Sequence, residues 1–306
     1  MQGALVLCRF VHYAAVVLLF GGGAFRIYAL DGAGNSDALR AYDDWFARVA
    51  VACAAAALLS AVGVLLSTAA RMAGEPALAL DPATIAAVLW ATDFGWVWQG
   101  RLILAAGLVV ICCLLPRPAA RRAVAPLSLL LVGSLAAVGH AVMDEGATGL
   151  GHEVNDALHL IAAGIWLGGL PPLFWLLQRA RREPGSGGLD LAREAVPRFS
   201  QTGYVAVGLL VLTGAVNACL LVGTPAALAA TPYGRLLLVK IALAAAMVGL
   251  ALGNRFRLLP RLRKPEPHAS VAALARSVVA EQALGAAILA VVSVLGTWPP
   301  ALHAGM

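Results

Sequence analysis

The chain alternates between long apolar segments and short polar connections. Eight of the apolar segments approach or exceed the length of about 20 residues that a helix needs to cross a bilayer. They lie at about 4–28, 46–70, 100–116, 124–143, 154–177, 202–222, 234–253 and 277–297. We therefore predict an all-α polytopic membrane protein, a bundle of eight transmembrane helices that forms a single domain over residues 1–306.

A further apolar stretch, near 82–98, lies between the second and third spans. An Asp-Pro pair opens it, which is a typical helix start, and it carries Trp90, Trp96 and Trp98. Indole rings gather at the level of the lipid headgroups. We predict a short interfacial helix here.

Composition supports a protein whose main partner is the lipid bilayer. Hydrophobic residues make up 61% of the chain and charged residues 12%, and the mean hydropathy is +0.84. Soluble globular domains carry about twice that share of charge, so a soluble protein is excluded. The net charge of +6 does not indicate nucleic-acid binding, because the basic residues cluster in the connections, where membrane topology requires them.

The positive-inside rule orients the bundle. Most of the 22 lysines and arginines stand near three connections that must share one side if eight helices alternate. These residues are Arg117, Arg121, Arg122, Arg179, Arg181, Arg182, Arg193, Arg198, Arg255, Arg257, Arg261, Arg263, Lys264 and Arg276. We predict that this side is the cytoplasm, so both termini face outward. The connection after the first span, where acidic residues outnumber Arg40, is a tolerated exception on the inner side.

This orientation collects histidines near the outer surface. His12 lies about two turns below that surface, and His140 lies in the last turns of the fourth span. His152 falls in the following loop, His159 about one turn down the fifth span, and His303 after the eighth. Clustered imidazoles at one end of a membrane bundle predict a metal site.

The neighbours of these histidines favour copper. His140 and Met143 are spaced i, i+3, and imidazole with thioether selects copper over magnesium or calcium. Asp156 is three positions before His159 and can accept from one ring nitrogen, which fixes the other for a metal. Cys8 precedes the first histidine by one turn. The predicted copper ligands, for an ion of undefined oxidation state, are His12, His140, Met143, His152, His159, Asp156 and Cys8.

Other polar residues fall within or at the ends of the spans. Asn217 lies in the sixth span, Lys240 in the seventh and Glu281 in the eighth. Buried ionisable groups in membranes are costly and need partners. We predict that Glu281 pairs with Arg26 or Arg255, and the alternative is a role in a relay.

Two glycine patterns, Gly164-x-x-x-Gly168 and Gly249-x-x-x-Gly253, can let neighbouring helices approach closely. No phosphate-binding loop, nucleophile elbow, zinc-protease motif or dinucleotide fingerprint occurs, and the five cysteines form no framework. We therefore predict that the protein is not an enzyme.

Several stretches together resemble the CopD/PcoD family of copper-resistance membrane proteins. They are GHAVMDEGATGLGHEVNDALHLIAAGIWLGGLPPL, ATDFGWVWQGRLIL, TPYGRLLLVKIALA, ALGNRFRLLPRL and SVVAEQALGAAILAVVSVLG, and they span most of the chain in order. The resemblance implies a bacterial inner-membrane protein, with both termini periplasmic, that moves copper inward after receiving it from a separate periplasmic CopC-like chaperone. The residues in the matching stretches, to which we assign no family role, are His140, His159, Trp166, Tyr233, Lys240, Asn254, Arg255 and Glu281.

Two alternatives remain open on the sequence alone. His12 paired with His140 or His159 would suit a bis-histidine b-type cytochrome that transfers electrons. A copper sensor or scaffold that binds at the outer loop without translocation would use the same histidines.

Overall fold

A computed structural model contains eight long apolar helices, which confirms the predicted fold class. It describes residues 2–32, 36–139, 146–183, 185, 187–263 and 267–301. The eight candidate spans are α1 (Gln2–Tyr28), α2 (Asp37–Ala73), α4 (Asp93–Leu114), α5 (Arg117–Gly133), α6 (Gly146–Arg182), α7 (Gly188–Val222), α9 (Pro232–Gly253) and α10 (His268–Leu295). Shorter elements are η1 (Pro76–Leu80), α3 (Pro82–Ala91), η2 (Ala136–Val138), α8 (Pro225–Ala230), the π-helical η4 (Asn254–Leu258) and η5 (Leu259–Arg263).

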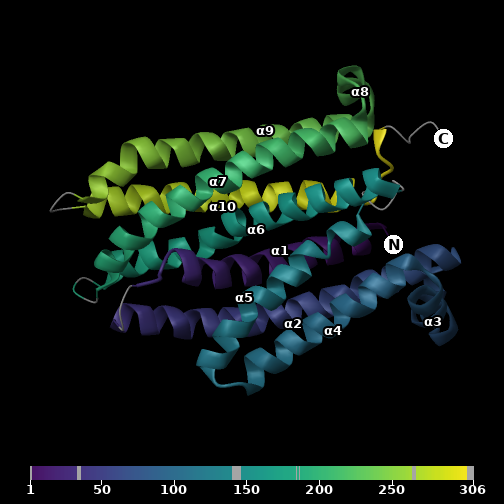
Figure 1. Ribbon diagram of the computed structural model, residues 1–306, viewed down its shortest axis with the longest axis horizontal. Coiled ribbons are helices and arrows are strands. Elements are labelled where there is room, and N and C mark those ends of the chain that lie inside the picture. Colours follow the sequence, from purple (N-terminus) through teal and green to yellow (C-terminus); the bar gives the residue numbers. More distant parts are fainter. Residues whose placement is uncertain are drawn as a thin grey trace.

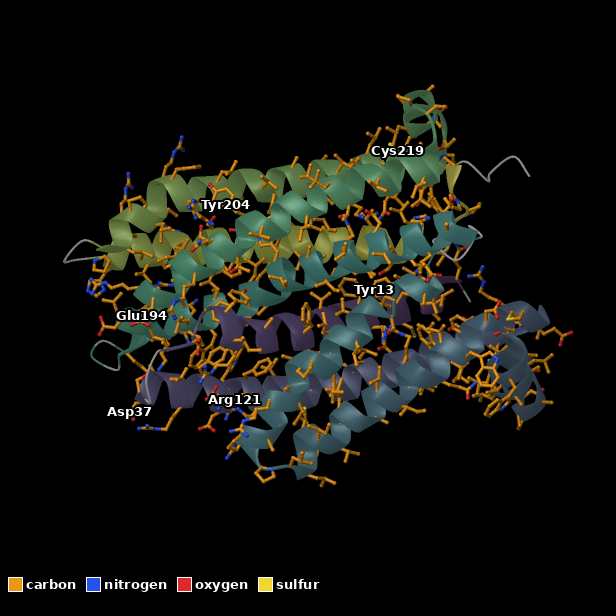
Figure 2. The ribbon with its side chains drawn as sticks, viewed as in Figure 1. Tyr13, Asp37, Arg121, Glu194, Tyr204 and Cys219 are labelled. Atoms are coloured by element: carbon orange, nitrogen blue, oxygen red, sulfur yellow. The ribbon has the colours of Figure 1, made fainter. Side chains whose placement is uncertain are left out.

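The long helices run side by side and alternate in direction (Figure 1). At one end lie the start of α1, the end of α10, and the short helices α3 and α8; we call this the terminal end. At the opposite end α1, α4 and α6 finish and α2, α5 and α7 begin; we call this the basic end. Arg121 and Glu194 lie at the basic end and Cys219 at the terminal end (Figure 2).

Ion pairs with arginines explain why acidic residues at the start of α2 are tolerated at the basic end. Asp43 accepts hydrogen bonds from Arg26 of α1, at 2.9 Å, and from Arg121 of α5. Asp44 lies 3.4 Å from Arg117. The carboxylates thus neutralise arginines of two neighbouring helices, so the exception to the charge pattern has a structural cause.

The segment predicted as one interfacial helix over 82–98 is divided. α3 ends at Ala91, because Thr92 adopts an extended conformation and caps the next helix through Gly95. At its start, hydrogen bonds from Thr84 to Asp81 hold the pKa of that carboxyl below its usual value. Trp98, predicted to lie at headgroup level, is instead buried in α4 and donates to Ala61 of α2 at 3.0 Å.

The glycine pattern on α6 brings two helices into backbone contact, as predicted. A Cβ on Gly21 of α1 would collide with the backbone of Gly164 and Gly168. By contrast, Gly249 and Gly253 have open space around them, so the second pattern mediates no close approach within the described chain. α1 also packs against α2, α5 and α10, which makes it the central helix.

Candidate functional site

A cavity of about 190 Å³ opens between α1, α5, α6, α7, α9 and α10, towards the terminal end, and several polar groups line it. Apolar side chains form most of its wall. The ionisable and polar groups that line it are Arg9, Tyr13, His152, Asp156, His159, Asn217, Tyr233 and Lys240. We call it the histidine cavity.

One face of α6 supplies the potential ligands. His152, Asp156 and His159 are spaced i, i+4 and i+7, so they follow one another along that face. The prediction that His152 lies in a loop is wrong, because α6 begins at Gly146, earlier than the predicted residue 154. His152 therefore lies within the helix and is only 3% exposed.

A hydroxyl on α7 fixes the tautomer of His159. Thr213 donates its own proton to the carbonyl of Leu209, at 2.6 Å. The threonine oxygen can then only accept from the Nδ1–H of His159, at 2.9 Å. The lone pair of the imidazole is consequently on Nε2, the nitrogen that remains for a ligand in the cavity.

Two asparagines hold Asp156 in place. The amide of Asn217 donates to Asp156 Oδ1 at 3.0 Å, and Asn155 donates to Asn217 at 2.6 Å and to the carbonyl of Thr213 at 3.0 Å. The expected hydrogen bond between Asp156 and the His159 ring is replaced by the bond from His159 to Thr213. The carboxylate is thus positioned by α7 rather than by its neighbour on α6.

Cationic side chains face the same cavity. Lys240 of α9 and Arg9 of α1 line it together with Asp156. A metal ion entering the histidine cavity would compete with these cations for the carboxylate. The net charge of the site is therefore less negative than the nearby acidic residues in the sequence would suggest.

His12 lies in a different cavity, of about 150 Å³, which we call the His12 cavity. The ring is 1% exposed and both its nitrogens have protein partners. Nδ1 donates to the carbonyl of Ala57 at 3.0 Å, and Nε2 accepts from Arg101 at 2.6 Å. α1 packs against both α5 and α6, yet His12 and His159 line different cavities.

The remaining predicted ligands divide into two groups. Cys8 packs against Gly63 of α2, whose added Cβ would lie 2.6 Å from the thiol sulfur. His140 and Met143 fall outside the described residues. Among the residues that the structure does describe, no group of three His, Cys, Asp or Glu side chains is arranged to hold a metal ion. The complete ligand set therefore remains a prediction.

Three important residues escaped the sequence interpretation. Arg101 is 1% exposed in α4 and also donates to the carbonyl of Leu131 at 2.7 Å and to Ser134 at 2.6 Å. The sequence did indicate Arg101, because a lone arginine within an apolar span needs buried partners. Thr213 and Asn155 gave no such signal, because their roles depend on which helices pack together.

The prediction that Glu281 pairs with Arg26 or Arg255 is wrong. Glu281 accepts from the amide of Asn254 at 2.6 Å, whereas Arg26 pairs with Asp43 and Arg255 donates to Ser200 at 2.9 Å. Residues Asn254 to Leu258 form the π-helical turn η4, whose geometry the sequence does not predict. This turn brings Asn254 to α10.

Comparison with known proteins identifies the family. Residues 1–150 match the model of the copper resistance protein D-like N-terminal domain, and residues 193–295 match that of copper resistance protein D. The chain is 34% identical to the inner membrane protein YebZ of Escherichia coli (strain K12), over 95% of this chain and 97% of that protein. It is 32% identical to copper resistance protein D of Pseudomonas syringae pv. tomato, over 97% of each chain.

A third relative is longer. The copper transport protein CutJ of Bacillus subtilis (strain 168) is 31% identical over 95% of this chain, which spans only 52% of that protein. No solved structure matches the chain. Two family models match the chain in sequence order, and two relatives match it almost end to end. The chain is a multi-pass membrane protein that belongs to the copper resistance protein D family.

Proposed function

We propose that this protein binds copper in the histidine cavity and imports it across the bacterial inner membrane. The observation that carries the proposal is His159, whose Nε2 lone pair is left for a ligand by the hydrogen bond to Thr213. Imidazole nitrogen is a good copper ligand in either common oxidation state. The names of the relatives refer to copper resistance, copper transport and the inner membrane, which supports this cargo and location.

The placement of charge orients the protein in the membrane, and the inward direction of transport is what the family resemblance implies. The basic end carries the arginine-rich connections, so we place it in the cytoplasm and both termini in the periplasm. Copper would then enter the histidine cavity from the periplasmic side, handed over by a CopC-like donor protein. Fusion of a periplasmic-active reporter enzyme to the C-terminus should give activity. A reporter active only in the cytoplasm would contradict this orientation.

Copper would be the cargo of this cavity and would be held there only briefly. His159, His152 and Asp156 line the cavity from one face of α6. As these described residues stand they form no three-ligand metal group, so His159 is the ligand on which the proposal rests. His140 and Met143 stay predicted ligands from the preceding connection. A transit site needs only moderate affinity, because cargo must also leave.

Copper accumulation in living cells tests the proposal. Cells that lack the protein would be supplied with the wild type, His159→Ala, or His268→Ala, which removes an exposed histidine at the opposite end. We expect the wild type and His268→Ala to raise cell copper and His159→Ala to leave it at the level of cells without the protein. Unchanged copper with the wild type would favour a scaffold or sensor. A Soret band in the purified protein that is lost in His159→Ala would favour a cytochrome.

A further inference from the structure

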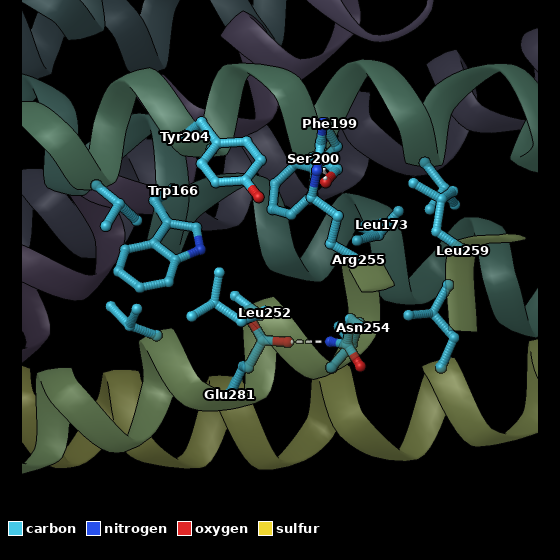
Figure 3. Close-up of a pocket in the computed structure, with 17 residues that line it drawn as sticks. Trp166, Leu173, Phe199, Ser200, Tyr204, Leu252, Asn254, Arg255, Leu259 and Glu281 are labelled. Atoms are coloured by element: carbon cyan, nitrogen blue, oxygen red, sulfur yellow. Dashed lines mark hydrogen bonds between the residues drawn. The ribbon is translucent and has the colours of Figure 1, made fainter. Parts of the chain in front are cut away.

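A third cavity, of about 80 Å³, lies closer to the basic end, between α6, α7, α9 with η4, and α10 (Figure 3). Most of its wall is apolar, with Trp166, Leu173 and Phe199 among the contributing side chains. Its polar members are Ser200, Asn254, Arg255 and Glu281. We call it the Glu281 cavity.

The carboxylate of Glu281 is buried there with a neutral partner. The residue is 2% exposed, and its hydrogen bond comes from the amide of Asn254 at 2.6 Å. Arg255, the cationic side chain that lines the cavity, makes its contacts with other residues. Arg255 donates to Ser200 of α7 at 2.9 Å and lies over the ring of Tyr204, 4.3 Å from its centroid. A carboxylate inside a membrane bundle is costly unless a cation balances it, and usually marks a functional site.

The backbone supports this arrangement. In the π-helical turn Asn254–Leu258, backbone hydrogen bonds span one residue more than in an α-helix. The neighbouring residues Asn254 and Arg255 both face the Glu281 cavity. Such turns are frequent at functional sites.

The two cavities lie one behind the other along the same four helices. On each helix the corresponding lining residues are seven or eight positions apart, about two turns or roughly 10–12 Å. The pairs are His159 and Trp166 on α6, Gly214 and Val207 on α7, Lys240 and Val248 on α9, and Ile288 and Glu281 on α10. The direction from the first member to the second leads toward the basic end in every case.

The linings of the two cavities come closest on α6, where adjacent residues belong to different cavities. Leu167 lines the histidine cavity, and its neighbour Trp166 lines the Glu281 cavity. The indole is 5% exposed and is buried in the wall of the Glu281 cavity.

We propose that the Glu281 cavity is a second, inner binding site for the transported cation, reached from the histidine cavity past Trp166. This rests on the proposed function, because it names the route of the same cargo. The ligand is the Glu281 carboxylate. The amide of Asn254 now donates its N–H to that carboxylate at 2.6 Å and would have to turn over to present its oxygen to the cation. Such oxygen donors suit a divalent ion. Arg255 on the opposite wall disfavours prolonged residence of the cation and promotes its release toward the basic end.

Copper stoichiometry of the purified full chain tests this inference. Equilibrium dialysis against Cu(II), and against Cu(I) kept reduced with ascorbate, would compare the wild type with Glu281→Gln and His159→Ala. Glutamine keeps the size of the side chain and the oxygen that accepts from Asn254, but removes the charge. We expect two copper ions per wild-type chain in at least one of the two oxidation states, and one in either variant. Glu194→Gln, which removes a carboxylate at the same end outside the cavity, should bind two.

Failure of the inference and failure of the proposed function give different results. Wild-type stoichiometry in Glu281→Gln, with one ion lost in His159→Ala, would overturn the inner site and leave the outer one intact. Wild-type stoichiometry in His159→Ala would count against the proposed function, whatever Glu281→Gln does. A wild type that binds no copper in either state would overturn both.

A second measurement keeps Glu281 in place. Cu(II) quenches indole fluorescence at short range, and Trp166 lies in the wall of the Glu281 cavity. The decrease of fluorescence on saturation with Cu(II) should be smaller by one quenched indole in Trp166→Phe than in the wild type. An equal decrease in both proteins would overturn the inner site even if Glu281→Gln fails to fold.

Discussion

Two histidines show how hydrogen bonding separates residues that look alike in the sequence. His12 and His159 both lie in apolar spans about one or two turns from the same end. Arg101 occupies Nε2 of His12, whereas Thr213 takes Nδ1 of His159 and leaves Nε2 for the cavity. The sequence predicted both as copper ligands. Their partners come from α4 and α7, and no sequence pattern announced them.

Thr213 should control copper affinity without touching the metal. Thr213→Val keeps the shape of the side chain but removes the acceptor that fixes the His159 tautomer. We expect the Kd for copper to rise about 10-fold or more, as is typical when the partner of a ligating histidine is lost. The matched control is Ser293→Ala, since Ser293 also donates to a carbonyl of its own helix. Equal affinities of the wild type and Thr213→Val in a copper titration would show that this hydrogen bond is not needed.

Arg101 should be essential for stability. Arg101→Leu would leave Nε2 of His12 without its donor in a buried site and would remove the hydrogen bonds to Ser134 and to the carbonyl of Leu131, which would keep only the donor from Ser134. Each such loss costs about 1–3 kcal/mol, so we expect a marked decrease in the thermal stability of the detergent-solubilised protein. Arg122→Leu, at an exposed position of α5, should change stability by no more than about 0.5 kcal/mol. A Tm for Arg101→Leu equal to that of Arg122→Leu would contradict this role.

At the scale of the elements, hydropathy predicted the spans but not their ends. α2, α6 and α7 each begin eight or more residues before the predicted span, in polar segments that extend beyond the apolar core. The early start of α6 moves His152 from a predicted loop to a buried helical position. The π-helical turn η4 was equally hidden. These features depend on caps and on packing against neighbours, which hydropathy does not record.

The contact between α1 and α6 offers a direct test of helix packing. Gly168→Ala would place a methyl group against the backbone of α1, and overpacking of this kind costs about 1–3 kcal/mol. Gly249→Ala meets open space, so it should be neutral or slightly stabilising. Thermal unfolding of the two variants in the same detergent should therefore shift in opposite directions or differ clearly in size. A stable Gly168→Ala protein would show that α1 and α6 are further apart.

At the scale of the whole molecule, charge and hydropathy predicted most of the architecture. Eight alternating helices, both ends of the chain on one side, and arginines gathered at the other all follow from the sequence. The sequence could not show that the histidines divide between two cavities, since this depends on helix contacts. We propose that the chain is a single domain, because α1 packs against α6 and α10 and so joins the two family-model segments.

The central claim is that copper crosses the membrane by way of His159. The most direct measurement is the rate at which copper enters sealed vesicles reconstituted with the purified wild type or with His159→Ala. We expect copper to enter wild-type vesicles faster than protein-free vesicles, and His159→Ala to return the rate to the protein-free level. Entry at the protein-free rate with the wild type, or at the wild-type rate with His159→Ala, would contradict the account.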